Sequence, residues 1–288
     1  MTRRILISGA SVAGNTAAWW LSRTGFEVTV VEKWPSFRQG GQNIDVRDVG
    51  REVLQRMGLD EQALRHGTHE EGTAWVDEDG KVVAQFITDE LGADGPTAEL
   101  EILRGDLSQL LFQSAKDRCS YRFGDTIKTL DQQGDEVEVQ FRSGETGRFD
   151  IIIVAEGVGS PTREMILPGE NKERWMDLTI AYFTIPRVAD DDRMWRWYNA
   201  THGRSISLRP DNHGTTRAML SIQKKSDGEE HWEKDRQTTF LRDHFKDAGW
   251  QAERVLAGLE ASEDYYFDVL RQVHLPRWSN GRVVLTGD

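Results

Sequence analysis

Cysteine is almost absent from this chain of 288 residues, in which Cys119 stands alone. A single thiol can form neither an internal disulfide nor a cysteine-cluster metal site, so we expect a reduced, cytoplasmic protein that is held together by its core. The seven histidines are scattered and show no His-Glu-x-x-His spacing. We therefore expect no metal site.

Long apolar runs and an excess of positive charge are missing too. No run approaches the ~18 residues of a membrane-spanning helix, and the start of the chain is too glycine-broken for a signal peptide. The net charge of -12 argues against nucleic acid and anionic membranes as partners. With 38% hydrophobic and 29% charged residues, the composition is typical of a packed globular protein, and the length suggests about two domains.

The first 32 residues organise the chain, and they read as strand, glycine turn, helix, strand and acid. Ile5 to Ile7 form the short apolar run of a buried parallel strand, and Gly9 follows where the backbone must turn. The free amides at the start of the next helix offer a seat for a pyrophosphate. Glu32 ends the second strand, where a carboxylate can accept both hydroxyls of an adenosine ribose.

The glycine pattern is a variant of the dinucleotide-binding fingerprint, because Ser11 replaces its middle glycine. A hydroxymethyl group is small, and its hydroxyl could donate to a phosphate, while Gly14 allows close packing of helix on strand. The alternative is a tight strand-to-helix turn in some other α/β protein. We favour nucleotide binding because the helix, the second strand and its terminal acid all fit.

Two later stretches carry candidate ligand contacts. Arg38 and Gln42 flank two adjacent glycines, which suggests a loop whose backbone lies close to a ligand, although a plain flexible connection is nearly as compatible. Asp106 is expected to cap a helix, and Arg104 just before it is either a surface arginine or a cofactor contact. A second buried strand, 151–155, should lie beside the first and bring the glycine turn at Gly157 to the same ligand.

The remaining segments alternate between sheet and helix patterns. Turn residues separate three antiparallel strands between 126 and 149, and an Asp-Gly turn joins a hairpin over 74–86. Further strands are expected at 178–186, 194–199, 205–208 and 217–223, and helices at 49–57, 229–248 and around 255.

Taken together, these motifs resemble the single-component FAD-dependent aromatic hydroxylases. This is the para-hydroxybenzoate hydroxylase-like group, which includes polyketide hydroxylases and tetracycline-inactivating monooxygenases. The resemblance covers the whole chain. It is carried by Gly9-Ala-Ser11-Val-Ala-Gly14, Glu32, the Arg38/Gly40/Gly41 loop, Arg104, the stretch from Ala155 to Arg163, and Arg282-Val-Val-Leu-Thr-Gly287-Asp288.

The resemblance implies an α/β fold with an α+β substrate part: a Rossmann-like FAD-binding domain with an inserted antiparallel-sheet substrate domain. The FAD-binding domain would comprise 1–72, 98–168 and 276–288, and the substrate domain 73–97 and 169–275. In the family the middle motif reads Asp-Gly and touches both FAD and the nicotinamide donor, and Glu156 replaces that aspartate here. The implied cofactor contacts are Gly9, Ser11, Val12, Ala13, Gly14, Glu32, Lys33, Arg38, Gly41, Gln42, Arg104, Glu156, Gly157 and Asp288.

The implied activity is a monooxygenase reaction on an aromatic, phenolic or polyketide-like molecule. NADPH or NADH would reduce FAD, and oxygen would then add at flavin C4a to give the hydroperoxyflavin that transfers hydroxyl. Alternatives are a flavin dehydrogenase or halogenase, and a flavin- or nucleotide-binding protein without turnover. Substrate contacts could come from Phe183, Trp195, Trp197 and Tyr198, although core packing is the favoured interpretation of these side chains. A base could come from His202 or His213, although the favoured interpretation of both is a solvated loop residue.

The last strand, 282–286, is expected to deliver Asp288 to the ribityl chain of the flavin. A helix follows at once in the resembled family, and its N-terminus would favour the negative charge of reduced flavin. We therefore expect either a longer gene product or a second polypeptide that completes the site.

The residue that tests the nucleotide interpretation most simply is Glu32. Replacing it with alanine should weaken FAD binding by about 1.5–3 kcal/mol, the range for hydrogen bonds to a charged group. Titration of FAD into both proteins measures the difference. Equal affinities would mean that the carboxylate does not bind the ribose.

Overall fold

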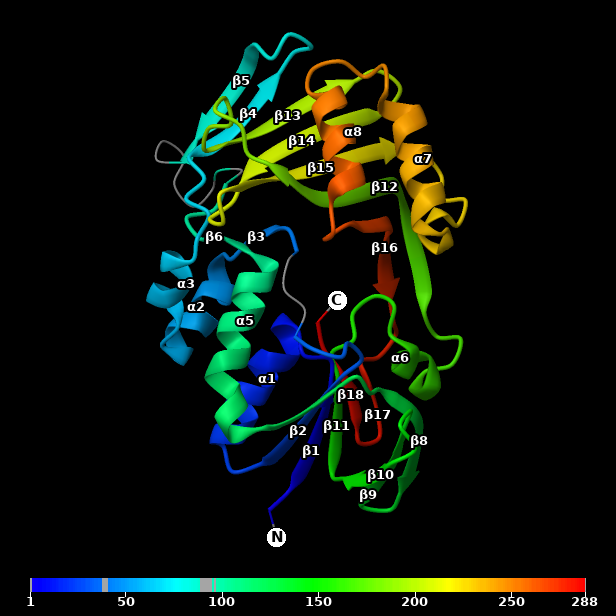
Figure 1. Cartoon of the computed structure of the whole chain (residues 1–288). Coiled ribbons are helices and arrows are strands. Elements are labelled where there is room, and N and C mark those ends of the chain that lie inside the picture. Colours follow the sequence, from blue (N-terminus) through cyan, green and yellow to red (C-terminus); the bar gives the residue numbers. More distant parts are fainter. Residues whose placement is uncertain (1, 38–40, 89–94, 96, 288) are drawn as a thin grey trace. The chain divides into compact units, whose positions relative to one another are not determined.

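The protein is described by a computed structural model that covers residues 2–37, 41–88, 95 and 97–287 (Figure 1). The chain divides into two compact units, each assembled from separate stretches of sequence. Unit 1 comprises Met1–Gln39, Gly105–Arg174 and Arg271–Asp288, and unit 2 comprises Gly40–Arg104 and Trp175–Leu270.

Unit 1 is built on a six-stranded sheet in the order β17-β18-β11-β1-β2-β7. The strands are parallel except for β17, which pairs antiparallel with β18. The expectation that 151–155 lies beside the first strand is thus confirmed. The bounds are β1 (Arg4–Ser8), β2 (Glu27–Glu32), β7 (Ser120–Phe123), β11 (Ile151–Val154), β17 (Ser279–Asn280) and β18 (Val283–Leu285).

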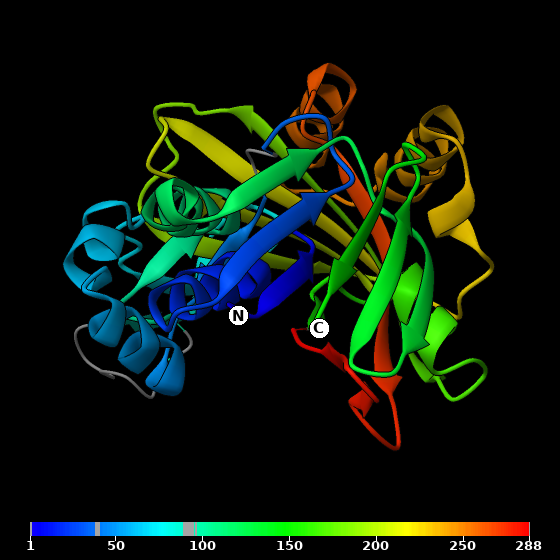
Figure 2. The same ribbon diagram turned by 90° about the horizontal axis from the view of Figure 1, so that it is seen from below.

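Both faces of this sheet are covered, as its continuous apolar strands require. Ile5 and Ile7 pack with Ala18 of helix α1 (Val12–Arg23), whereas Leu6, between them, packs with the second layer. That layer is a three-stranded antiparallel sheet together with the short helix α6, and Figure 2 shows these strands from below. Its elements are β8 (Ile127–Gln133), β9 (Glu136–Phe141), β10 (Thr146–Phe149) and α6 (Pro161–Ile166).

Unit 2 contains most of a seven-stranded sheet in the order β16-β12-β15-β14-β13-β4-β5. Neighbours from β12 to β13 pair antiparallel, as expected for the substrate domain, and β4 joins β13 in parallel. The bounds are β4 (Gly72–Val76), β5 (Val82–Ile87), β12 (Lys172–Pro186), β13 (Met194–Ala200), β14 (Arg204–Pro210), β15 (Thr215–Gln223) and β16 (Tyr266–His274).

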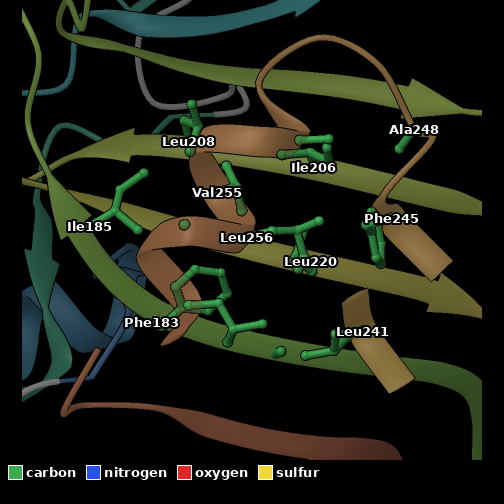
Figure 3. Packing of buried hydrophobic residues seen from close by; sticks show 14 of the residues in the cluster. Phe183, Ile185, Ile206, Leu208, Leu220, Leu241, Phe245, Ala248, Val255 and Leu256 are labelled. Atoms are coloured by element: carbon green, nitrogen blue, oxygen red, sulfur yellow. The ribbon is translucent and has the colours of Figure 1, made fainter. Parts of the chain in front are cut away.

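Helices α7 (Lys234–Phe245) and α8 (Ala252–Ala261) cover one face of this sheet (Figure 1). Alternate residues of the strands point toward them, because side chains along a strand project to opposite faces in turn. Figure 3 shows the resulting core, in which no side chain carries charge. Its members include Phe183, Ile185, Ile206, Leu208, Leu220, Leu241, Phe245, Val255 and Leu256, all buried.

The stretch 40–72 and the segment 98–104 belong to unit 2, although the expected boundaries assign both to the FAD-binding domain. Hydrogen bonds inside unit 2 account for this assignment. Strand β3 (Asn43–Asp45) pairs with β6 (Glu101–Leu103), and the Asn43 side-chain amide donates to the carbonyl of Pro210 at 3.2 Å. Helices α2 (Asp48–Met57) and α3 (Asp60–Arg65) complete this part.

Three helix details differ from expectation. Helix α5 (Arg104–Ala115) starts at Arg104, so Asp106 lies in its first turn, where its charge still suits the helix dipole, and is not its cap. The single helix expected over 229–248 is a 3₁₀ turn, η3 (Glu229–His231), followed by α7, because the backbone is extended at Trp232 and Glu233. The apolar spacing of the helix expected over 49–57 places Val49 on the same face as Leu54 and Met57, which are buried, yet Val49 is 70% exposed.

Helix α8 packs so closely on the sheet at Gly258 that alanine, normally the better helix former, should destabilise the protein there. A Cβ at Gly258 would lie 2.3 Å from Cγ2 of Ile185. Gly258→Ala should therefore lower the free energy of unfolding by about 1–3 kcal/mol, the usual cost of overpacking, although alanine favours helices. Thermal or urea unfolding measures the change.

The matched control is Ala257→Gly, at an exposed position of the same helix. It should cost only about 1 kcal/mol through helix propensity. A Gly258→Ala variant that is as stable as the native chain would contradict the tight packing of α8 on β12.

Candidate functional site

The glycine turn after β1 is shaped by backbone segments that approach closely. Gly9 has φ +106°, and a Cβ there would lie 2.2 Å from the carbonyl oxygen of Ala155. A Cβ on Gly14 would lie 1.9 Å from the carbonyl oxygen of Gly9. Any side chain at either glycine would thus force the turn, the helix and the neighbouring strand end apart.

Helix α1 begins directly at this turn and is suited to hold an anion. Ser11 occupies the N-cap position without a side-chain capping bond, and the first turn contains no acidic residue. The amides of Val12, Ala13 and Gly14 have no partner inside the helix, because a helix leaves its first amides unsatisfied. They present donors and the positive end of the helix dipole to a phosphate.

Glu32 is held across the mouth of the same turn. Its Oε2 accepts from the Ala10 amide at 2.8 Å, and its Oε1 accepts from the Trp34 amide at 3.1 Å. Each carboxylate oxygen keeps acceptor capacity for a ligand hydroxyl. Lys33 follows as an exposed side chain whose Nζ lies 5.9 Å from the ring centroid of Trp34.

The last motif of unit 1, at the end of β18, lies beside the first motif, at the start of α1. A Cβ on Gly287 would lie 3.1 Å from Cβ of Ala13, and the Thr286 amide donates to Val154 at 2.9 Å. The end of β18 therefore reaches the first turn of α1. Arg38 and Asp288 lie outside the described residues.

Glu156 has a structural environment that the sequence did not reveal. Its carboxylate accepts from the hydroxyls of Ser8 at 2.5 Å, Ser160 at 2.6 Å and Thr162 at 2.7 Å, and from the Thr162 amide at 3.2 Å. These bonds tie the end of β1 to the start of α6. The Ser160-Pro161 pair is a helix-start signal that could have indicated such a tie.

Gly157 borders a cavity of about 460 Å³ inside unit 1. A Cβ at Gly157 would meet no atom within 4 Å, so the turn is open on this side. Arg163 fixes the turn by donating to the carbonyls of Gly157 and Val158, at 3.3 and 2.7 Å, and its buried Nε has no partner among the described residues.

In unit 2, Gln42 and Arg104 are brought together, because the Arg104 amide donates to the Gln42 carbonyl at 2.8 Å. Gly41 beside them has φ +113°, a conformation that favours glycine. This part of the expected cofactor loop is therefore anchored to the start of α5.

The aromatic candidates divide between the two faces of the large sheet. Phe183 and Tyr198 lie in the core beneath α7 and α8, and the Tyr198 hydroxyl donates to Ala248 at 2.7 Å. Trp195 and Trp197 are half-buried, with ring centroids 4.8 Å apart. Arg209 stacks on Trp195, its guanidinium carbon 3.8 Å from the ring centroid.

Arg209 belongs to a buried polar cluster. It donates to Glu70 at 2.8 Å and to Glu101 at 2.7 Å. Burial raises the pKa of Glu101 to about 8, with a further rise from its hydrogen bond to Asp45 and an opposing effect of Arg209. Burial also raises the pKa of Asp45, but its hydrogen bonds with Glu101 and Arg47 outweigh this effect and lower the pKa overall. The opposite directions of the two shifts mean that Glu101 binds a proton more readily than Asp45.

The histidine candidates lie in turns. His202 has φ +62° in the exposed turn between β13 and β14, and His213 is exposed in the turn between β14 and β15. Across the described ranges, no group of three or more His, Cys, Asp and Glu side chains could hold a metal ion. No helix in those ranges has the length and apolar character needed to span a membrane.

The sheet of unit 1 and its ligand-ready helix start define a dinucleotide-binding protein. A family model described as an FAD binding domain matches residues 2–288. The chain belongs to this family and is an FAD-dependent monooxygenase, so FAD as its cofactor and the resemblance to flavin hydroxylases are confirmed.

Curated relatives support the assignment along nearly the whole chain. FAD-dependent monooxygenase asL4 of Sarocladium schorii is 33% identical over 99% of this chain and 69% of its own length. A flavin-dependent monooxygenase of Legionella longbeachae is 33% identical over 99% and 73%. An uncharacterized protein of Mycobacterium tuberculosis, Rv1260, is 35% identical over 99% and 77%.

Solved structures share the fold. The tetracycline destructases Tet(51) and Tet(55) are each 30% identical and superpose with TM-scores of 0.85 and 0.87. Each comparison covers 100% of this chain and about three quarters of the other, 75% and 74%. The fold class expected from the sequence is therefore confirmed.

The buried cluster predicts a pH effect on stability. The pKa of Glu101 is higher in the folded chain than its ordinary value, so the stability it contributes is present at low pH and is lost as pH rises toward about 8. Glu101→Gln retains an amide donor and a carbonyl acceptor but cannot titrate. We expect the variant to show a flatter dependence of unfolding free energy on pH between about 5 and 8 than the native chain.

Urea unfolding at several pH values measures both slopes. The control is Glu99→Gln, an exposed carboxylate two residues away, which should leave the slope unchanged. Parallel slopes for Glu101→Gln and the native chain would contradict the raised pKa of Glu101.

Proposed function

We propose that this chain uses FAD, O2 and NADPH or NADH to hydroxylate a phenolic or enolic, polyketide-like small molecule. The observation that carries the proposal is the convergence, within unit 1, of the open start of α1, the fixed carboxylate of Glu32 and the end of β18. Bound FAD supplies the redox chemistry by accepting hydride and activating oxygen, and the protein binds, orients and insulates it.

The roles of the residues follow from their geometry. The amides of Val12, Ala13 and Gly14 would bind the pyrophosphate, and Glu32 would accept the ribose hydroxyls with the oxygens that Ala10 and Trp34 already orient. The residues fit the cofactor, since no acid in the first turn of α1 opposes a phosphate and no side chain caps its amides. Ser11 would add a hydroxyl donor.

A second group of contacts would surround the flavin half of the cofactor. We assign Gly41, Gln42 and Arg104 to this group because the bond between Arg104 and Gln42 presents them as one rigid element. Glu156 would act indirectly, by positioning Gly157, since its carboxylate is already engaged by three hydroxyl donors and one amide donor. Lys33, Arg38 and Asp288 remain proposed contacts from the resemblance.

The substrate would contact the Trp195 and Trp197 side of the large sheet. Phe183 and Tyr198 are buried in the core. The indole rings of Trp195 and Trp197 contact each other, and Arg209 of the neighbouring strand β14 stacks on Trp195. Flat indole rings suit fused aromatic molecules. Two of the similar solved structures, at 30% identity, are tetracycline destructases, and tetracycline is a fused-ring polyketide. We therefore choose tetracycline as the first substrate to test.

The test combines flavin detection with turnover. We expect the purified chain, supplied with FAD, to show flavin absorbance bands, to be bleached anaerobically by NADPH or NADH, and to consume oxygen with tetracycline as one oxygen atom enters the product. Labelled dioxygen identifies the source of that atom. Product formation without label incorporation would indicate a dehydrogenase, and a colourless protein that FAD cannot reconstitute would remove the proposal.

A further inference from the structure

A second cavity, of about 570 Å³, lies entirely within unit 2. Three segments form its wall: the end of α3 with the loop that follows, the link between β12 and β13, and the turn between β14 and β15. Among its lining residues, only His213 was a candidate for a role in the reaction, as a base. Its charged or titratable lining residues are Arg65, His66, His69, Arg187, Arg193, Asp211 and His213, and we call this cavity the Arg/His pocket.

The only carboxylate among these lining residues does not offer its charge to the cavity. The side chain of Asp211 has no exposed surface, and it accepts from the amides of His213 and Thr215, both at 2.9 Å. Arg217, whose Nε lies 3.1 Å from Asp211, compensates its charge. Of the lining side chains that the structure describes, the charged groups that face the cavity are therefore the three guanidinium groups of Arg65, Arg187 and Arg193.

The exposed side chains of Arg65 and Arg187 interact only weakly with carboxylates. Arg65 has an ion-pair contact with Glu61 at 3.8 Å, in which both side chains are mostly exposed and solvent screens the attraction. Arg187 donates to a backbone carbonyl, that of Asp191, at 3.1 Å. Their charge thus remains available to a ligand.

The segments are connected by hydrogen bonds to backbone carbonyls. The Asn212 side-chain amide donates to the carbonyl of His66 at 2.9 Å, and the Glu71 amide donates to the carbonyl of Arg193 at 2.8 Å. His69, between these ties, has φ +54°, a left-handed conformation that is uncommon for residues other than glycine and often occurs at functional sites. The wall is therefore fixed before any ligand binds.

A concentration of positive charge is unexpected on a chain with a net charge of -12. Like charges held together repel, and an anion that neutralises them gains from all of them at once. Guanidinium groups match the oxygens of a phosphate in a bidentate manner. We propose that the Arg/His pocket binds the phosphate group of a small molecule.

Two sources could supply this group: the 2′-phosphate of NADPH, or a separate phosphorylated or free phosphate ligand. The first would rest on the proposed function, since NADPH is one of its two candidate donors. The second would stand whether or not the chain is a hydroxylase. Binding measurements without turnover therefore separate failure of this proposal from failure of the proposed function.

The experiment measures equilibrium binding to the full chain by calorimetry, with FAD saturating so that the amides of α1 are occupied. The probes are inorganic phosphate, pyrophosphate, NADPH and NADH. The variant is Arg65→Gln combined with Arg193→Gln, and the control is Arg142→Gln, an exposed arginine of unit 1. Thermal unfolding checks that each protein is folded, and Arg187→Gln replaces the double variant if that protein is not.

We expect pyrophosphate to bind the native chain and the control equally, and to bind the double variant more than about tenfold more weakly, because charge-assisted bonds are lost. If NADPH exceeds NADH in affinity and loses this advantage in the variant, the donor's 2′-phosphate is the ligand group. If the two dinucleotides bind alike while pyrophosphate still distinguishes the variant, a separate phosphate ligand is indicated. No saturable binding of any probe, or equal affinities in variant and control, would overturn the proposal.

Discussion

The close approach of backbone segments at Gly9 and Gly14 is the constraint on which the nucleotide unit depends. With a Cβ only 1.9 Å from Gly9 or 2.2 Å from Ala155, no other residue fits, so α1 can settle onto the turn and β11 can lie against β1. That arrangement directs the first amides of α1 and the carboxylate of Glu32 to one place. It also leaves room for the end of β18, where Gly287 reaches Ala13. The catalytic chemistry belongs to FAD, and the glycines determine where FAD can be held.

Unit 2 is organised differently, by a core on one face of its sheet and buried charges on the same strands. Arg209 joins Glu70 and Glu101, which lie more than 100 residues before it in the sequence, and the raised pKa of Glu101 favours its neutral form, which lowers the negative charge of the cluster. Such a cluster is costly to bury unless each member is partnered. It explains why 40–104 stays with this unit and does not follow the motif-based boundary at residue 72.

Much of the fold could be predicted because local pattern and tertiary structure agree. The run Ile5 to Ile7, the buried strand 151–155 and the acid at Glu32 all occur where the pattern indicated. What failed depended on contacts between distant residues. The break before α7 was hidden because no proline or glycine marks Trp232 and Glu233, and the start of α5 at Arg104 was hidden because Gly105 and Asp106 suggest a helix that begins later.

The candidate site shows the same division. The ligand-facing positions of Gly9 to Gly14 were readable as a motif, but the bond from Ser8 to Glu156 was not, since these residues lie 148 positions apart in the sequence. The pairing of Arg209 with Trp195 required the register between neighbouring strands. The Arg/His pocket combines three turns, none of which has a pattern of its own.

The central claim is that β1, α1 and Glu32 hold the ADP half of FAD. The most direct test compares the affinities of FAD and FMN for the chain by quenching of flavin fluorescence, because FMN has the same flavin but no adenosine or pyrophosphate. The account predicts that FAD binds at least about a hundredfold more tightly, since two or more charge-assisted contacts distinguish them. Equal affinities of FAD and FMN would contradict it.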